Sequence, residues 1–166
     1  DVGCHWCDDK DSWDENSHPI ISVEEIVKKS AGLSDFVVVT GGEPLMWNMN
    51  PLTKALKKLG KKTHIETSGA YPLTGIWDWV CLSPKKAKLP IEDVYNHAHE
   101  LKIIIYNNHD FKFAEQESKK VNKNAILYLQ PEWGKREEMM PLMVDFIKKN
   151  PKWKISLQTH KYLNIP

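Results

Sequence analysis

The fold is decided by Phe36-Val37-Val38-Val39-Thr40-Gly41-Gly42-Glu43-Pro44. The first five residues form a compact apolar and β-branched run, which is typical of a strand buried on both faces. The Gly-Gly-Glu-Pro turn ends this strand, and its glycines allow a small polar ligand to approach the backbone closely. The stretch therefore predicts a strand that carries a ligand site at its carboxyl end.

The rest of the chain alternates between strand-like and helix-like patterns. Further apolar runs with strand character lie at 64–67, 79–83, 101–106, 125–130 and 155–158. Helical patterns begin at Ser22 and cover 50–60, 111–121 and 136–149, with Pro141 expected to kink the last helix or to mark its start. Strands that alternate with helices predict parallel strands with crossover connections. We expect one α/β domain over residues 1–166, built as a single layer or a partial barrel.

Polar and turn-forming residues gather where the expected strands end. In parallel α/β folds, ligands bind at the carboxyl ends of the strands. Any one of these ends is weak evidence, because glycine and proline terminate strands everywhere, but together they predict one shared site. The segments are 40–44, 66–69, 83–85, 130–132 and 158–160.

Composition excludes several classes of function. The 23 basic and 22 acidic residues nearly cancel, so the charge indicates no nucleic-acid partner. The sequence contains no apolar run of the length that a membrane span needs. Three cysteines do not make a disulfide framework, which favours a reducing, cytoplasmic location.

Cys4 and Cys7 are separated by two residues, a spacing that allows both thiolates to reach one metal centre. The residues alone leave three interpretations open: a redox pair, a structural zinc site and an iron–sulfur centre. The chain starts with Asp1 and not with Met, so we expect a leading segment that could hold a further ligand. Cys81 lies in an apolar strand and is expected to be a core thiol.

The combination of Cys4-His5-Trp6-Cys7 with Thr40-Gly41-Gly42-Glu43-Pro44 resembles the radical S-adenosylmethionine superfamily. That superfamily holds a [4Fe–4S] cluster in a Cys-x3-Cys-x2-Cys loop, whose first cysteine would here precede Asp1. The segments 3–8, 12–14 and 83–85, with the ending 157–166, resemble the 7-carboxy-7-deazaguanine synthase family along the whole chain. This resemblance implies a partial, reduced (β/α)6 TIM-like barrel, with a first strand upstream of Asp1.

The resemblance also implies an activity. Members of this family are carbon–nitrogen lyases that convert 6-carboxy-5,6,7,8-tetrahydropterin to 7-carboxy-7-deazaguanine with loss of ammonia, on the way to queuosine and other 7-deazapurines. They use a [4Fe–4S] cluster and S-adenosylmethionine to produce a 5′-deoxyadenosyl radical, and Mg²⁺ assists the ring chemistry. The implied partners are the pterin substrate, an electron donor such as flavodoxin, and a second copy of the chain in a homodimer.

Site residues follow from the matching positions. Cys4 and Cys7 are implied as cluster ligands, and Asp9 as a ligand of Mg²⁺ at a position where the family can have Thr. Thr40, His160 and Pro166 are implied on the substrate side, with the terminal carboxylate of Pro166 as a hydrogen-bond acceptor for the pterin. Residues implied to contact S-adenosylmethionine are Trp6, Cys7, Asp8, Gly41, Gly42, Glu43, Glu66, Ser83, Pro84, Lys85 and Gln130. Among these we expect Glu43 to accept from the ammonium group of the cofactor.

Two other classes of function stay open at this point. One is a radical S-adenosylmethionine activase that makes a glycyl radical on a partner protein. The other is a zinc-binding or redox α/β module without radical chemistry, whose thiols are structural. The residue that precedes Asp1 separates them, because a cysteine there supports the cluster.

Overall fold

The computed structural model describes Gly3, Cys7 and residues 18–165. Six parallel strands form one sheet in which spatial order follows chain order. The six strands expected from the sequence are present, but the last one runs over Trp153–Ile155 and shares only Ile155 with the expected 155–158. The strands are β1 (Phe36–Val39), β2 (Lys62–Thr67), β3 (Trp79–Leu82), β4 (Glu100–Ile105), β5 (Ile126–Pro131) and β6 (Trp153–Ile155).

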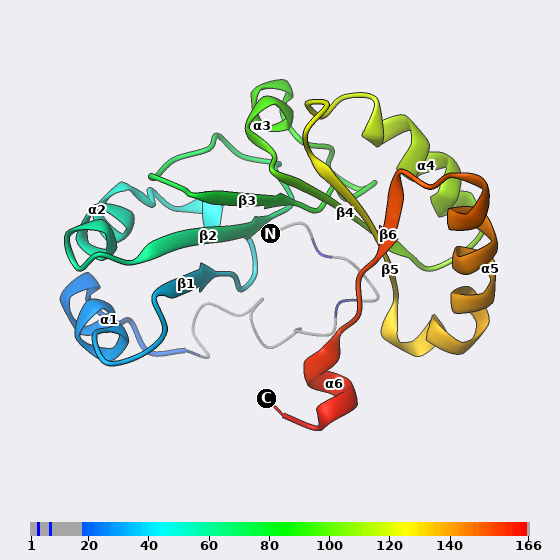
Figure 1. Cartoon of the computed structure of the whole chain (residues 1–166). Coiled ribbons are helices and arrows are strands. Elements are labelled where there is room, and N and C mark those ends of the chain that lie inside the picture. The colour runs from blue at the N-terminus through cyan, green and yellow to red at the C-terminus, as the bar shows by residue number, and fades with distance from the viewer. Residues whose placement is uncertain (1–2, 4–6, 8–17, 166) are drawn as a thin grey trace.

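The sheet curves into an arc with helices on its outer, convex side (Figure 1). Within the described residues β1 and β6 are the two edges of the sheet and do not pair, so the architecture is the expected α/β partial barrel. None of the helices in this described part is both long and apolar enough to cross a bilayer. The helices are α1 (Val23–Ser30), α2 (Asn50–Lys58), α3 (Glu92–His97), α4 (His109–Ser118), α5 (Arg136–Lys149) and α6 (Thr159–Leu163), with 3₁₀ turns η3 (Pro44–Met46) and η4 (Trp133–Lys135).

Local sequence signals account for the helix ends. The Ser22 hydroxyl accepts a hydrogen bond from the backbone N–H of Glu25 and caps α1, as its spacing predicts. Pro141 lies inside α5, which runs through it from Arg136 to Lys149. The expectation that Pro141 would mark the start of this helix is therefore wrong. Helices α3 and α6 are short and were not predicted, because six and five residues are too few to show a period.

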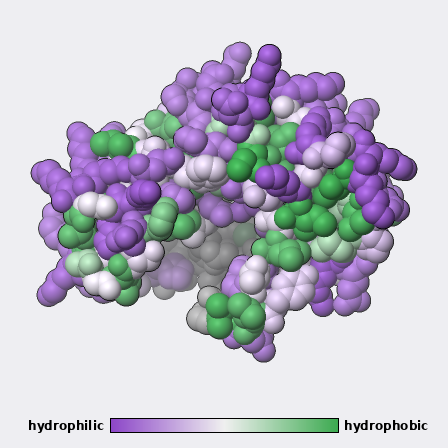
Figure 2. All heavy atoms as spheres, viewed as in Figure 1, coloured by the Kyte–Doolittle hydropathy of each residue, from purple (hydrophilic) through white to green (hydrophobic). Residues whose placement is uncertain are grey.

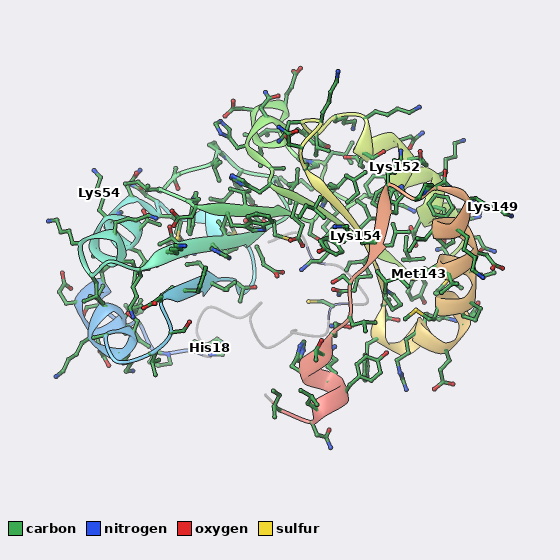
Figure 3. The ribbon with its side chains drawn as sticks, in the orientation of Figure 1. His18, Lys54, Met143, Lys149, Lys152 and Lys154 are labelled. Atoms are coloured by element: carbon green, nitrogen blue, oxygen red, sulfur yellow. The ribbon has the colours of Figure 1, made fainter. Side chains whose placement is uncertain are left out.

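The main core lies between the sheet and the outer helices. In β4 the side chains of Leu101, Ile103 and Ile105 are buried, whereas the alternate residues are only half-buried on the concave side. Met143 is fully buried and points from α5 toward the sheet, and Lys149 points away from it (Figure 3). The concave face is thus the side on which polar strand residues can meet a ligand.

Strand β1 is more exposed than its sequence predicts. It is an edge strand, and Phe36 and Val38 are 50% and 54% exposed. The expectation of burial on both faces is wrong, because an apolar run cannot distinguish a central strand from the edge of an open barrel. Exposed apolar side chains also gather at α6, where Leu163 is 63% exposed (Figure 2).

Candidate active site

Glu43 joins the carboxyl ends of β1 and β2. Its side chain is buried, and one carboxylate oxygen accepts from the backbone N–H of Leu45 at 3.0 Å and from the Thr67 hydroxyl at 2.6 Å. The other oxygen accepts from the backbone N–H of Ser68 at 2.7 Å and from the Ser68 hydroxyl. A single buried carboxylate therefore fixes the turn after β1 against the loop after β2.

This network bears on the role expected for Glu43. A carboxylate offers about four acceptor positions, and four donors from the chain itself use them here. A ligand ammonium would have to share an oxygen or replace one of these donors. The side chain is thus first a structural anchor of the turn that carries Gly41 and Gly42.

The backbone of Gly41 faces open space at the end of β1. Its φ of +129° lies in a region that side-chain-bearing residues rarely adopt, and a Cβ built there would meet no atom of the described residues within 4 Å. Thr40 and Gly42 beside it are exposed. Backbone groups in this position can approach a polar ligand closely, so the structure fits the ligand-binding role expected of this turn.

The loop after β2 packs tightly against β3. Gly69 has a φ of +74°, and a Cβ there would lie 2.5 Å from Cδ1 of Leu82. The backbone N–H of Ser83 donates to the carbonyl of Thr67 at 2.8 Å. Three successive strand ends are therefore held at fixed positions relative to one another.

Ser83 and Pro84 are buried, and Lys85 is half-buried at the end of β3. The Lys85 ammonium donates to the Ser83 hydroxyl at 2.7 Å, which folds the side chain back over the strand end. This places a positive charge at the end of β3, beside Ser83, whose backbone N–H donates to Thr67 at the end of β2. A carboxylate-bearing ligand at these strand ends would find a cation within the site.

The concave floor below these loops carries an ion pair between a largely buried lysine and a partly exposed glutamate. Lys102 Nζ lies 2.5 Å from a carboxylate oxygen of Glu66, and the Lys102 side chain is 12% exposed. Glu100 accepts from the indole N–H of Trp79 at 3.2 Å and contacts Sγ of Cys81 at 3.3 Å. Glu66 therefore faces the concave side, as its position at a strand end predicts.

Charge balance fixes the protonation states on this floor. Burial alone would lower the pKa of Lys102, but the neighbouring Cys81, Glu66 and Glu100 outweigh it, and the pKa is raised. Burial raises the pKa of the Cys81 thiol. Lys102 is therefore a retained ammonium, and Cys81 is the buried, protonated core thiol that the sequence predicts.

The far side of the arc carries Gln130 and His160. Gln130 is half-buried in β5, and its side-chain oxygen accepts from the Ser156 hydroxyl at 3.1 Å. His160 is exposed in α6, near the contact in which the rings of Trp133 and Tyr162 meet edge to face at 5.1 Å. The structure therefore places both residues at the carboxyl ends of β5 and β6, on the edge of the sheet that carries the other strand-end residues.

Cys7 carries a free, partly exposed thiol. The other residues expected near the cluster, Cys4, Trp6, Asp8 and Asp9, lie outside the described residues, as does Pro166. Among residues 18–165 with Gly3 and Cys7, no group of three or more His, Cys, Asp or Glu side chains could hold a metal ion. Cys7 thus belongs to the part of the expected cluster loop that the structure describes. Its free, partly exposed thiol is compatible with a role as a cluster ligand.

Sequence reasoning missed several residues that support the site. The sequence could have identified Lys102, because a lysine between Leu101 and Ile103 in an apolar strand requires a charged or polar partner when it is buried. Ser68 lies within the predicted strand-end segment 66–69, but its bond to Glu43 was not predicted, and Ser156 was not singled out. A hydroxyl becomes informative only when its partner across the sheet is known. The same holds for Lys86 and Asp110, which form an ion pair between the loop after β3 and the first turn of α4.

Comparisons with known proteins place the chain among relatives and agree with its fold. No protein-family model matches the chain. The chain is 61% identical over 166 residues to a 7-carboxy-7-deazaguanine synthase of Flavobacterium psychrophilum, covering 100% of this chain and 79% of that protein. It is 48% identical to the enzyme of that name from Synechocystis, covering 99% and 79%. A crystal structure of QueE from Escherichia coli matches with a TM-score of 0.80 and 25% identity, covering 95% of this chain and 80% of that chain.

Proposed function

Because the chain belongs to the 7-carboxy-7-deazaguanine synthase family, we propose that its strand-end site performs the reaction of that family. The chain is a radical S-adenosylmethionine enzyme and a lyase of queuosine biosynthesis, acting on a small molecule. The substrate is 6-carboxy-5,6,7,8-tetrahydropterin, and the product is 7-carboxy-7-deazaguanine. A [4Fe–4S] cluster and S-adenosylmethionine supply the radical chemistry when bound, and the protein positions and shields the reacting groups.

The observation that carries this proposal is the Glu43 network. It holds the Gly41-Gly42 turn open at the end of β1 and fixes it beside the ends of β2 and β3. The exposed backbone of this turn would bind the amino acid moiety of S-adenosylmethionine. Lys85 would attract its carboxylate, since the ammonium already lies at this strand end. These roles need no rearrangement of the sheet.

We propose further cofactor contacts from the concave face of the sheet. Glu66, oriented by Lys102, and Gln130, oriented by Ser156, both face the concave side. Trp6, Asp8, Ser83 and Pro84 complete the set that we propose for S-adenosylmethionine. Preformed side chains of this kind reduce the ordering that binding requires, so they favour a single orientation of the cofactor.

Cys4 and Cys7 are the proposed cluster ligands within this chain. Cys7 is a partly exposed thiol that is not engaged in a disulfide, as a cluster ligand requires. A third cysteine from a preceding segment completes the proposed loop. Thr40, His160 and Pro166 are proposed for the substrate, and Asp9 for Mg²⁺, since carboxylate oxygens suit this hard cation.

Several other features belong to the same proposal. Residues 1–166 form a single core domain, which is supported by one continuous sheet over the described strands. We propose an electron donor such as flavodoxin, a homodimer and a cytoplasmic location. The two described cysteines, Cys7 and Cys81, are free thiols, which suits a reducing compartment.

Anaerobic reconstitution of the holoenzyme tests this function. With dithionite, S-adenosylmethionine and 6-carboxytetrahydropterin, the wild type is expected to form 7-carboxy-7-deazaguanine and ammonia. Tight stoichiometric zinc binding without cleavage of S-adenosylmethionine would contradict the proposal. Addition and chelation of Mg²⁺ in the same assay, compared between wild type and Asp9→Ala, test the proposed metal ligand.

A further inference from the structure

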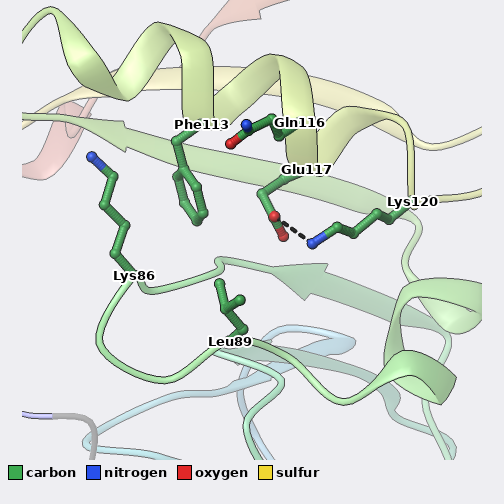
Figure 4. Close-up of a pocket in the computed structure, with 6 residues that line it drawn as sticks. All are labelled: Lys86, Leu89, Phe113, Gln116, Glu117 and Lys120. Atoms are coloured by element: carbon green, nitrogen blue, oxygen red, sulfur yellow. Dashed lines mark hydrogen bonds and ion pairs between the residues drawn. The ribbon is translucent and has the colours of Figure 1, made fainter.

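The loop after β3 carries two neighbouring lysines whose side chains have different partners. Lys85 donates to Ser83 at the strand end. Lys86 instead extends toward α4 (Figure 4). Its Nζ lies 2.5 Å from a carboxylate oxygen of Asp110. The backbone N–H of Lys88 donates to the carbonyl of Lys85 at 3.2 Å and closes a tight turn. The position of Lys85 therefore depends on how this turn is held.

Asp110 is a suitable anchor for the turn. Its carboxylate is buried, with the side chain 8% exposed. One oxygen accepts from the backbone N–H groups of Tyr106 and Asn107, both at 2.8 Å, and the other faces Lys86. The same side chain therefore fixes the loop after β4 and binds the loop after β3.

The ion pair sits at the edge of a cavity outside the barrel. This cavity has a volume of about 460 Å³ and is lined by Lys86, Leu89 and Phe113, with Gln116, Glu117 and Lys120 (Figure 4). Lys86 Nζ lies 5.5 Å from the centre of the Phe113 ring. Within the described part of the chain, Lys86 has the Asp110 carboxylate as its ion-pair partner.

The Lys86–Asp110 pair is expected to affect the position of the turn after β3 more than the free energy of unfolding. Lys86 is 49% exposed, and partly exposed ion pairs contribute little to the free energy of unfolding. Its location, however, is one residue from Lys85, the proposed partner of the cofactor carboxylate. Losing the pair would release the turn without exposing the core.

We infer that the Lys86–Asp110 ion pair positions the Ser83-Pro84-Lys85 element for S-adenosylmethionine, an inference that rests on the function proposed above. Lys86 and Asp110 are positioning residues, because they act through Lys85 and Ser83 and do not touch the cofactor. The pair couples the ends of β3 and β4, in the same way that Glu43 couples the ends of β1 and β2.

The test compares Lys86→Met with Lys86→Arg and with Lys112→Met, an exposed lysine on α4. Binding of S-adenosylhomocysteine to the holoenzyme is measured by calorimetry, and KM is measured for S-adenosylmethionine and for the pterin. Lys86→Met is expected to raise the Kd for S-adenosylhomocysteine and the KM for S-adenosylmethionine about fivefold each, which corresponds to about 1 kcal/mol. The pterin KM should stay unchanged, Lys86→Arg should bind nearly as well as the wild type, and Lys112→Met should equal the wild type.

Asp110→Asn is a second, independent variant. Its amide oxygen can still accept from the backbone N–H groups, but the charge that faces Lys86 is lost. It should reproduce the cofactor defect of Lys86→Met, and the double variant should bind no more weakly than either single variant. If Lys86→Met does not fold, Asp110→Asn decides the question by itself.

Two results would overturn the inference. One is that Lys86→Met and Asp110→Asn bind S-adenosylhomocysteine as well as Lys112→Met does. The other is an equal rise of both KM values, which would indicate general loosening of the fold. Wild-type cleavage of S-adenosylmethionine is the control for the proposed function itself: its absence would overturn that function, whereas its presence with unchanged variants would overturn only the positioning role.

Discussion

The Glu43 carboxylate accepts a hydrogen bond from the backbone N–H of Ser68 at 2.7 Å, across 25 residues of chain. Glu43 follows β1 and Ser68 follows β2, so this one bond joins two neighbouring strand ends. Thr67 donates to the other carboxylate oxygen at 2.6 Å. The geometry of the proposed cofactor turn therefore depends on a buried and fully hydrogen-bonded charge.

Glu43→Gln should destabilise the protein even though it preserves shape. The amide nitrogen would face one of the donors that now point at the carboxylate, which leaves a buried N–H group without an acceptor. The expected loss is about 2 kcal/mol in the free energy of unfolding, measured by urea denaturation. The exposed Glu24→Gln on α1 is the control, and equal stability of the two variants would refute the anchor role.

Gly41→Ala tests the turn through the backbone alone. A Cβ at Gly41 has open space around it, but the φ of +129° is strained for alanine, at a cost of about 1–3 kcal/mol. We expect weaker binding of S-adenosylhomocysteine by calorimetry, because the turn must change shape. Gly32→Ala also meets open space, at a residue without positive φ, and should bind normally. Normal binding by Gly41→Ala would show that the cofactor does not use this turn.

Lys102→Met should remove the positive charge that lies between Glu66 and Glu100 on the concave face of the sheet. Glu66 and Glu100 would lose their shared cation, and Glu66 would no longer be held in one orientation. Because Glu66 is partly exposed, we expect a moderate loss of about 2 kcal/mol in urea denaturation. The double variant with Glu66→Gln should recover part of that loss. If the losses of unfolding free energy in the two single variants, Lys102→Met and Glu66→Gln, simply add in the double variant, the two side chains are not coupled.

Asp78 gives a prediction for the pH dependence of stability. Hydrogen bonds from the Lys57 side chain and from the Thr63 backbone lower its pKa from 3.8 to about 2. A carboxyl whose pKa is lower in the folded state stabilises the protein above its unfolded pKa, and this contribution disappears as the pH falls through the folded pKa. The Tm advantage of wild type over Asp78→Asn should therefore shrink between pH 3.8 and about 2. A Tm difference that stays constant over this interval would contradict the ion pair.

The sequence was sufficient for the order of the strands and of the longer helices, but not for α3 and α6. Buried strands and capped helices leave local signals. The Ser22 cap and the runs that became β1 to β6 are examples. Exposure of Phe36 and Val38 could not be predicted, since edge position depends on which strands pair. Pro141 does not mark the start of α5, because packing of the buried Met139 and Met143 on either side of it can hold the helix despite the one hydrogen bond that a proline removes.

The parts of the candidate site that carry a sequence motif could be predicted. The residues that take part only through contacts with distant segments could not. The turn at Gly41 and Gly42 stands out in the sequence because of its composition. The partners that fix the site, such as Ser68 for Glu43 and Asp110 for Lys86, lie 25 and 24 residues away. Only the parallel register of the sheet brings such residues together.

The most direct test of the central claim is product formation by the anaerobically reconstituted holoenzyme, compared between wild type and Cys7→Ala. With S-adenosylmethionine, dithionite and 6-carboxytetrahydropterin, the wild type should form 7-carboxy-7-deazaguanine, detected by mass spectrometry. Cys7→Ala should form none, because a cluster ligand is lost. Absence of product from a wild type that has assembled its cluster, or equal product from Cys7→Ala, would contradict the account.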